Sequence, residues 1–281
     1  MLNILSIDFE DWYHPELIQR HLKNKKNTPS IIDGIEKILD LLRKNETFAT
    51  FFVVGELLEF KPNLLDKIVD NGHEIGFHTM HHTRLDSEGF KDRFVEEIKT
   101  FENLTDKKSK GFRAPTFSLN NSSSWVIDVL AEYNYIYDSS IVPAKTSMYG
   151  MPNAELTPYL ISTVSLEKND PKGKIIEFPL IITKFLGKKI PAAGGFYLRT
   201  LPMKMITDAI KLYEKNNVPA TLYIHSWELT PELMPKISLP VRENFITYYN
   251  LDKALPRISK LLKEFEFTSF SNYISHTGIS R

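Results

Sequence analysis

The sequence contains no cysteine, and its charges cancel, with 35 Lys and Arg residues against 35 Asp and Glu residues. Without cysteine the chain can form neither a disulfide framework nor a thiolate metal site, so histidines and carboxylates must hold any metal. A net charge of zero excludes a general electrostatic attraction to nucleic acid or to an anionic membrane, and it favours a substrate without high charge. Recognition must therefore depend on local groups.

The sequence also lacks the roughly 18 consecutive apolar residues that a membrane-spanning helix needs. Residues 1–8 contain no basic region followed by a long apolar core, so they do not resemble a secretory signal. We therefore expect a soluble cytoplasmic protein without an integral membrane segment. The chain has 281 residues, 42% of them hydrophobic, with no internal repeats and no convincing linker, which predicts one domain over residues 1–281.

Short apolar runs alternate with amphipathic helical patterns along the chain, which predicts a parallel α/β sheet covered by helices. A serine before the first helical pattern, Ser30, is the expected N-cap of that helix. Residues 141–174 are rich in Pro, Gly, Ser and Asn and should form loops and short strands. Strands are expected at 2–7, 47–54, 73–77 and 218–224, and helices at 30–45, 62–69, 87–101, 122–133, 202–216 and 251–265.

Groups that can bind metal or transfer protons follow two of the predicted strands. Asp8, Glu10 and Asp11 follow the first strand, and His78 and His82 follow the third. One helical turn would bring both imidazoles onto the same face, where they could share a divalent cation. Active sites of α/β barrels lie at the carboxyl ends of the strands, which favours a functional role. Surface histidines and a solvated acidic loop are the alternative interpretations of the two segments.

Three further polar residues lie near predicted strand ends. Arg113 precedes a proline turn and can hold a carboxylate in a bidentate fork, although a purely structural ion pair explains it equally well. His225 ends the strand at 218–224, a position that favours catalysis. Asp138 follows another short strand, where turn formation is the alternative explanation. A glycine turn at 194–195 is flanked by aromatic residues that could line a pocket, and it lacks the Lys-Ser/Thr of a phosphate loop.

The ordered series SIDFED, HTMHH, FRAP, YDSS and LYIHSWE resembles the five motifs of the polysaccharide deacetylase family (NodB homology, carbohydrate esterase 4), and it spans most of the chain. The chain is most similar to the bacterial exopolysaccharide-associated branch, whose members carry a DVEDW-type first motif, YDSS, EFP, a GGGYFR-like turn and HPWE. The resemblance implies a distorted (β/α) barrel of about seven parallel strands. It also implies metal-dependent removal of N-acetyl groups from a polysaccharide or a lipid-linked sugar.

The resemblance further implies that His78 and His82 hold a divalent metal, with zinc as first choice and cobalt, nickel or manganese as alternatives. A carboxylate of the first motif would be the third ligand. Because side chains alternate along a strand, Glu10 should share the face of Asp8 while Asp11 points away, so we predict Glu10 as that ligand. A turn at Phe9 would reverse this and let Asp11 coordinate, as the second aspartate of the family's usual TFDDG motif does.

The remaining roles also follow from the resemblance. Asp8 corresponds to the catalytic base and Arg113 to the arginine that orients it. His225 corresponds to the general acid, and Asp138 to the aspartate that tethers or tunes this histidine. Several aromatic side chains could stack on a sugar ring, although core packing would explain them equally well. The residues expected to contact the saccharide substrate are Trp12, Pro115, Tyr197, Arg199 and Trp227.

Two departures from the branch's motifs concern the expected site. HSWE replaces HPWE, which should not affect the chemistry, and GGFYLR replaces GGGYFR, which places Phe196 where it could reshape the pocket. His81, between the two expected ligands, should be a spectator. Two other functions stay open, namely a related barrel hydrolase acting on a non-sugar amide or imide, and a catalytically silent carbohydrate-binding relative.

Overall fold

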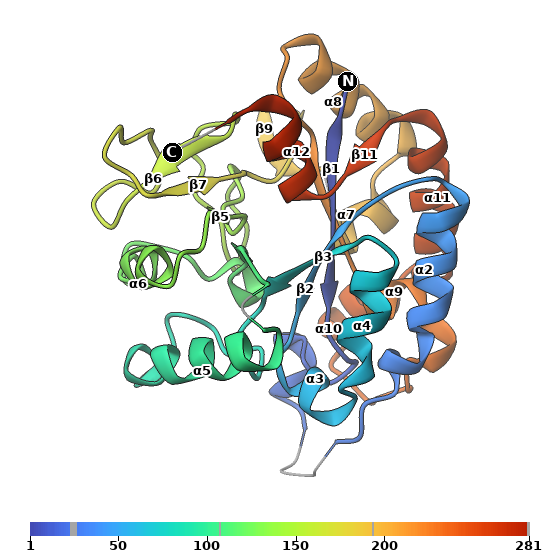
Figure 1. The fold of residues 1–281 in the computed structure, drawn as a ribbon. Helices are drawn as coiled ribbons and strands as arrows, with labels where there is room; N and C mark the ends of the chain where they lie inside the picture. The colour runs from blue at the N-terminus through green and yellow to red at the C-terminus, as the bar shows by residue number, and fades with distance from the viewer. Residues whose placement is uncertain (23–26, 107, 193, 280–281) are drawn as a thin grey trace.

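The computed structural model describes residues 1–22, 27–106, 108–192 and 194–279. Its centre is a curled, mostly parallel sheet in which the strands follow the order β10-β1-β2-β3-β4-β5-β7-β6, with β11 beside β1 (Figure 1). A separate hairpin is formed by β8 and β9. The strand bounds are β1 Asn3–Phe9, β2 Thr50–Val53, β3 Glu74–Phe77, β4 Gly111–Phe112, β5 Tyr137–Asp138, β6 Tyr159–Ile161, β7 Ile175–Glu177, β8 Ile182–Phe185, β9 Lys188–Pro191, β10 Thr221–His225 and β11 Phe267–Thr268.

The sheet forms an incompletely closed barrel. The seven strands from β10 to β7 are parallel, and only β6 pairs with its neighbour in the antiparallel sense. After β7 the chain returns towards β10, where the Ile181 N–H donates to the Thr221 carbonyl oxygen at 3.1 Å. The predicted distorted α/β barrel is therefore confirmed, with one irregular seam.

The expected amphipathic helices are all present and bury their apolar faces. Phe90, Phe94, Ile98 and Phe101 on α5 are fully buried, so this spacing serves core packing. In Figure 1, α2, α4 and α11 lie on one side of the molecule and α5 and α6 on the other. The helices at the predicted positions are α2 Ile35–Lys44, α4 Asn63–Asp70, α5 Phe90–Leu104, α6 Val126–Glu132, α8 Met203–Lys215 and α11 Ala254–Glu264.

Short helices cover the strand ends and the connections, and periodicity did not predict most of them. They are α1 Glu16–Gln19, α3 Glu56–Phe60, α7 Gly195–Thr200, α9 Ser226–Leu229, α10 Val241–Tyr248 and α12 Phe270–Thr277, with 3-10 turns η1 Ile31–Gly34, η2 Pro115–Phe117, η3 Pro231–Leu233 and η4 Leu251–Lys253. In the part of the chain that the structure describes, no helix is both long enough and apolar enough to cross a bilayer.

The N-terminus of η1 shows how the acidic segment after β1 is used. Ser30 occupies the N-cap position, but its hydroxyl donates to the Leu233 carbonyl oxygen at 3.1 Å instead of capping the helix. Asp11 takes over that function, because its Oδ2 accepts from the backbone N–H groups of Ser30, Ile31 and Ile32 at 3.0, 2.8 and 3.3 Å. The prediction that the Ser30 side chain caps this helix is therefore wrong, because its hydroxyl donates a hydrogen bond elsewhere and accepts none from the helix N-terminus.

Candidate active site

Strand register brings the candidate groups to one edge of the sheet. Asp8 is paired with His225 on β10 and with Phe52 on β2. His78 directly follows β3 and donates its backbone N–H to the Val53 carbonyl oxygen at 3.2 Å. Since β10, β1, β2 and β3 are consecutive neighbours, the residues at their carboxyl ends converge although they are far apart in the chain.

Glu10, His78 and His82 form a buried cluster whose ligand atoms all lie within 4.8 Å of one another. His82 Nε2 is 2.8 Å from Glu10 Oε2. His78 Nδ1 is 2.7 Å from the Arg113 carbonyl oxygen, which can only accept, so Nδ1 carries the proton and Nε2 keeps its lone pair. The side chains offer one carboxylate and two imidazoles, the donor set of many catalytic zinc sites.

Two further observations fit a cation at this cluster. Glu10 Oε2 is buried and accepts no well-aligned hydrogen bond from any residue that the structure describes. Burial lowers the pKa of His78 to about 4, so its imidazole is neutral at pH 7, as a metal ligand must be. Burial disfavours the charge of Glu10, but the neighbouring His82, His225 and His78 hold its pKa well below the ordinary range. A cation would give Glu10 Oε2 a partner besides His82.

The two histidines converge from a loop, so the predicted helical turn is wrong. Residues 78–89 contain no helix, and Thr79 and His82 adopt positive φ values of 58° and 54°. These left-handed conformations are unfavourable for residues with a Cβ, and they turn the chain sharply enough to return His82 towards His78. Their rings lie 5.0 Å apart between centroids.

The structure does not bring Asp11 to the Glu10–His78–His82 cluster. Its carboxylate is turned towards the start of η1 and accepts hydrogen bonds from the backbone N–H groups there. Its own backbone N–H donates to His14 Nδ1 at 2.7 Å. The alternative in which Asp11 is the third metal ligand is therefore wrong, because its carboxylate oxygens cap η1 and cannot reach the cluster as well.

Asp8 and Arg113 form a buried ion pair, in which Asp8 lines the cavity and Arg113 lies behind it. Arg113 Nη1 donates to Asp8 Oδ1 at 2.7 Å, and the other guanidinium nitrogens are held by Ser139 through Oγ and the carbonyl oxygen, both at 2.8 Å. The guanidinium also lies over the Phe52 ring, 4.3 Å from its centroid. One nitrogen contacts Asp8, so the predicted bidentate fork is wrong, and the single contact engages only one of the two carboxylate oxygens.

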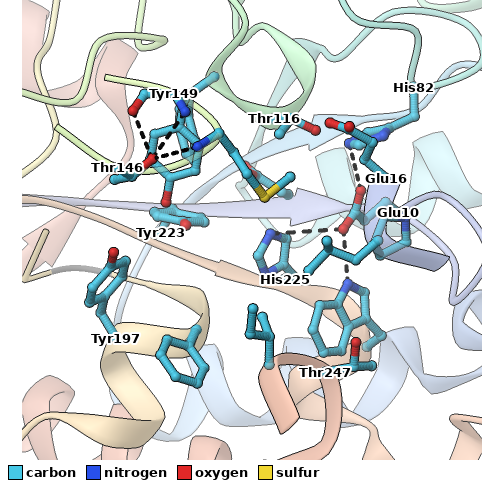
Figure 2. Close-up of a pocket in the computed structure, with 18 of the residues that line it drawn as sticks. Glu10, Glu16, His82, Thr116, Thr146, Tyr149, Tyr197, Tyr223, His225 and Thr247 are labelled. Atoms are coloured by element: carbon cyan, nitrogen blue, oxygen red, sulfur yellow. Dashed lines mark hydrogen bonds and ion pairs between the residues drawn. The ribbon is translucent and has the colours of Figure 1, made fainter. Parts of the chain in front are cut away.

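His225 is oriented by Glu228, which the sequence analysis missed. Its Nδ1–H donates to Glu228 Oε2 at 2.8 Å, while Nε2 lies 3.8 Å from Glu10 Oε1 (Figure 2). Burial disfavours the protonated ring, but the hydrogen bond and charge of Glu228, with the charges of Glu10 and Asp8, raise the pKa of His225 to about 9. A ring that is protonated at neutral pH can act as a proton donor.

Asp138 does not tether His225, so that prediction is wrong. The Asp138 carboxyl group accepts a hydrogen bond from the Ser140 hydroxyl at 2.6 Å. The histidine is held instead by Glu228, whose Oε1 accepts from Arg199 Nε at 2.6 Å. The HSWE segment contained the signal for this partner, because the acid three residues after a histidine at a strand end can fold back onto it in one helical turn.

The HSWE segment also positions Glu10 of the Glu10–His78–His82 cluster. Ser226 Oγ accepts from the Glu10 backbone N–H at 3.0 Å, and Trp227 Nε1 donates to Glu10 Oε1 at 2.9 Å. Proline at position 226 could not make that contact, so the serine adds a hydrogen bond to the backbone of Glu10. The glycine turn supports the same region, because a Cβ on Gly194 would lie 2.3 Å from the Tyr223 ring.

A cavity of about 330 Å³ opens beside these groups. Tyr197 lines it as predicted, together with Tyr149, Tyr223 and Thr247, which no sequence pattern singled out (Figure 2). Phe196 is also part of the wall. The cavity walls come from residues 116–117, the loop at 146–149, and the helices α1, α7 and α10, as well as from the strand ends.

Three of the five residues predicted to contact the saccharide line the cavity, namely Tyr197, Arg199 and Trp227. Trp12 and Pro115 are not among the residues that line the cavity. Trp227 is only 5% exposed, stacks on His225 at 5.0 Å between ring centroids, and binds Glu10, so only a small part of its surface is left to the cavity. Arg199 is 1% exposed, and its guanidinium is engaged by Glu228 and by the carbonyl oxygens of residues 246 and 249. Both side chains position other groups.

Comparison with known proteins divides the chain between two family models. Residues 29–136 match the model for polysaccharide deacetylase, and residues 139–275 match a domain of unknown function (DUF3473). Strands from both matched segments lie in the same sheet. A peptidoglycan deacetylase of Helicobacter pylori is 26% identical over 186 residues, which cover 61% of this chain and 56% of that protein. The chain spans about half the length of the curated relatives that it matches first.

Solved structures share the fold. A crystal structure described as a polysaccharide deacetylase from Mycobacterium smegmatis superposes with a TM-score of 0.53 at 16% identity, covering 98% of this chain and 90% of the other. An allantoinase superposes with a TM-score of 0.55 at 17% identity, covering 95% of this chain and 87% of the other. At such identities the likeness shows the fold, and the chemistry must be argued from the side chains.

Proposed function

We propose that this chain, which carries a domain of the polysaccharide deacetylase family (NodB homology, carbohydrate esterase 4), is a metal-dependent hydrolase. Its reaction would remove N-acetyl groups from a saccharide. The match of residues 139–275 fits the exopolysaccharide-associated branch of that family. One observation carries the proposal. The Glu10–His78–His82 cluster lines one cavity together with Asp8 and His225, which are held from behind by Arg113 and Glu228.

The three pairs or clusters divide the chemistry between them. A divalent ion held by Glu10, His78 and His82 would polarise a water molecule and the acetyl carbonyl group when bound. Asp8, oriented by Arg113 through Oδ1, accepts a proton from the attacking water at its other oxygen. His225 Nε2 donates a proton to the sugar nitrogen as the carbon–nitrogen bond breaks. Hydrolysis consumes one water molecule and gives acetic acid and a free amine, or equivalently acetate and an ammonium group, so atoms and charge balance.

The substrate can be tested directly with a panel of N-acetylated saccharides, including chitooligosaccharides, peptidoglycan fragments and lipid-linked N-acetyl sugars. We expect acetate release from at least one of them, dependent on added divalent metal. A cyclic ureide such as allantoin belongs in the panel, because an amide or imide substrate stayed open in the sequence analysis. Hydrolysis of the ureide without acetate release from any saccharide would replace the proposed substrate class. No turnover of any compound would favour a catalytically silent relative.

The metal content provides the first specific prediction. The purified protein is expected to contain one divalent ion per chain, with zinc the first choice, and elemental analysis after mild purification measures it. The double variant His78→Ala/His82→Ala should lose the ion, because only one carboxylate ligand remains. His81→Ala is the matched control, since this histidine is exposed and contacts Glu56 instead of the cluster. Retention of stoichiometric metal by the double variant would show that the site has been misplaced.

The proton donor provides the second prediction. His225→Ala should keep its metal but lower turnover by roughly 10²-fold or more, the usual size of an acid–base contribution. Glu228→Gln should cause a smaller loss, because the ring stays in place while the negative charge that favours its protonation is removed. Glu232→Gln, an exposed acid on the following turn, is the control. Full activity of His225→Ala would reduce His225 to a packing residue.

A further inference from the structure

Two buried acids beside the Asp8–Arg113 pair have no role in the chemistry described above. Asp138 ends β5, Glu177 ends β7, and the two are direct register partners on neighbouring parallel strands. Both are 0% exposed. Among the described residues neither forms a salt bridge with a basic side chain. One oxygen of each, Asp138 Oδ2 and Glu177 Oε2, accepts no hydrogen bond from any backbone N–H, hydroxyl or basic group. An ionised carboxylate pair in such a place would be very costly.

The two carboxyl groups lie within hydrogen-bonding reach of each other, which explains the two orphaned oxygens if one proton lies between them. Burial, and then the charge of Asp138, raise the pKa of Glu177 well above its ordinary value of 4.5. Burial also raises the pKa of Asp138, although hydrogen bonds and Arg113 act in the opposite direction. Glu177 is therefore the protonated partner and Asp138 the ionised one.

This pair holds residues 140 and 141 of the short loop 139–141, whose first residue, Ser139, binds Arg113. The Ser140 hydroxyl donates to Asp138 Oδ1 at 2.6 Å, and the Ile141 N–H donates to Glu177 Oε1 at 2.9 Å. Directly before these two residues, Ser139 accepts two hydrogen bonds from the Arg113 guanidinium, both at 2.8 Å. Ser140 Oγ also accepts from the Ala114 N–H at 2.8 Å, so loop 139–141 fixes the backbone of the arginine segment as well as its side chain.

We propose that Asp138 and Glu177 share one proton and act as positioning residues, which hold loop 139–141 so that Arg113 is aimed at Asp8. The Arg113 carbonyl oxygen also accepts from His78 Nδ1, so the same segment orients a metal-cluster histidine. The pair thereby gives a function to the YDSS and EFP segments together. The catalytic part of this inference rests on the proposed deacetylase function, whereas the shared proton does not.

The charged and titratable groups that face the pair are few. Arg113 approaches from the loop after β4 and favours the ionised state of Asp138. Tyr159 lies on the adjacent β6, and its hydroxyl donates to the Leu166 carbonyl oxygen at 2.6 Å. A second ionisation within the pair would thus place two negative charges together against one arginine, and loop 139–141 would lose its anchor.

The sign of the pH dependence follows from the raised pKa of Glu177. Between pH 4.5 and the folded-state pKa, the folded chain retains a proton that the unfolded chain releases, so the stabilising contribution is complete below about pH 4.5 and falls as pH rises. Glu177→Gln keeps the acceptor for Ile141 and an N–H donor for Asp138, but it cannot lose a proton. Its melting temperature should therefore rise relative to the wild type with increasing pH.

Infrared spectroscopy and thermal melting test the shared proton without any activity assay. The wild type at neutral pH should show the carbonyl stretch of a buried protonated carboxyl group, and Glu177→Gln should lack it. Glu132→Gln, which removes an exposed acid on α6, should retain the band and the wild-type pH dependence of melting. Absence of the band from the wild type, or parallel melting curves for wild type and Glu177→Gln at all pH values, overturns the shared proton.

Kinetics and NMR test the positioning role. Glu177→Ala should lower kcat by about 10-fold or more with KM and metal content nearly unchanged, and Glu177→Gln should restore most of the rate. The Arg113 Nε–H resonance should move in Glu177→Ala and stay in place in Glu177→Gln. An unchanged resonance in both variants, or a Gln variant as impaired as the Ala variant, overturns the positioning role. If Glu177→Ala does not fold, the infrared band and the pH dependence of the melting temperature of Glu177→Gln still decide whether Asp138 and Glu177 share a proton. Lack of turnover by the wild type would count against the proposed function alone.

Discussion

Asp8→Asn is expected to remove nearly all turnover, by about 10³-fold or more, while the protein keeps its metal. The asparagine oxygen can still accept from Arg113 Nη1, so the packing around the guanidinium is preserved. The amide nitrogen cannot accept a proton from water, which is the function we propose for the second oxygen of Asp8. Initial rates of acetate release and metal content, measured on the same preparation, provide the comparison.

Asp66→Asn is the matched control for this variant, because Asp66 is an exposed acid on α4. It should behave like the wild type in both assays. Full turnover by Asp8→Asn would exclude Asp8 as the base. Loss of metal from Asp8→Asn would have a different meaning, namely that Asp8 is a ligand and that the division of roles within the first motif must be reversed.

The second large effect separates the two neighbouring acids. Glu10→Gln should weaken metal affinity by more than the roughly 10–100-fold that follows from losing an outer-shell partner. Asp11→Asn should leave metal affinity unchanged and instead reduce stability by about 1–2 kcal/mol, because the carboxylate that caps η1 loses its charge. Competition with a calibrated chelator measures the affinity, and thermal or denaturant unfolding measures the stability.

The crossed outcome would contradict the geometry. If Asp11→Asn stripped the metal while Glu10→Gln bound it normally, the alternation of side chains after β1 would have been the wrong guide. The two substitutions are well matched, since each replaces a buried carboxylate by its amide and neither changes the side-chain volume much. Their effects on metal and on stability should therefore be separable within one pair of measurements.

The sequence predicted the sheet and its order of elements well, because apolar periodicity follows directly from backbone geometry. The same geometry placed Glu10 beside Asp8 and away from Asp11, and the structure has that arrangement. Strand ends were also a sound guide, since parallel strands put their carboxyl ends at one edge whatever their separation in the chain. His78, His82 and His225 all lie at that edge.

Hydrogen-bond partners were predicted less well. The tether of His225 was assigned to Asp138 by resemblance, and the structure shows Glu228 in that place. His78 and His82 were expected to approach each other through a helical turn, whereas a loop with left-handed residues brings them together. Trp227 and Arg199 were assigned to the sugar because their side chains suit sugar binding, yet both are buried and hold other side chains.

The sequence by itself determined which residues lie at strand ends and which face inward, since these depend on periods of two and 3.6 residues along a local segment. Only the tertiary structure decided which partner a polar group takes when that partner lies on another element. Asp138 illustrates the reason. Its nearest possible partners in space come from β4, from β7 and from loop 139–141. Packing selected Ser140 and Glu177 over His225. A hydrogen bond depends on a few tenths of an ångström between elements far apart in sequence, and no local pattern contains that distance.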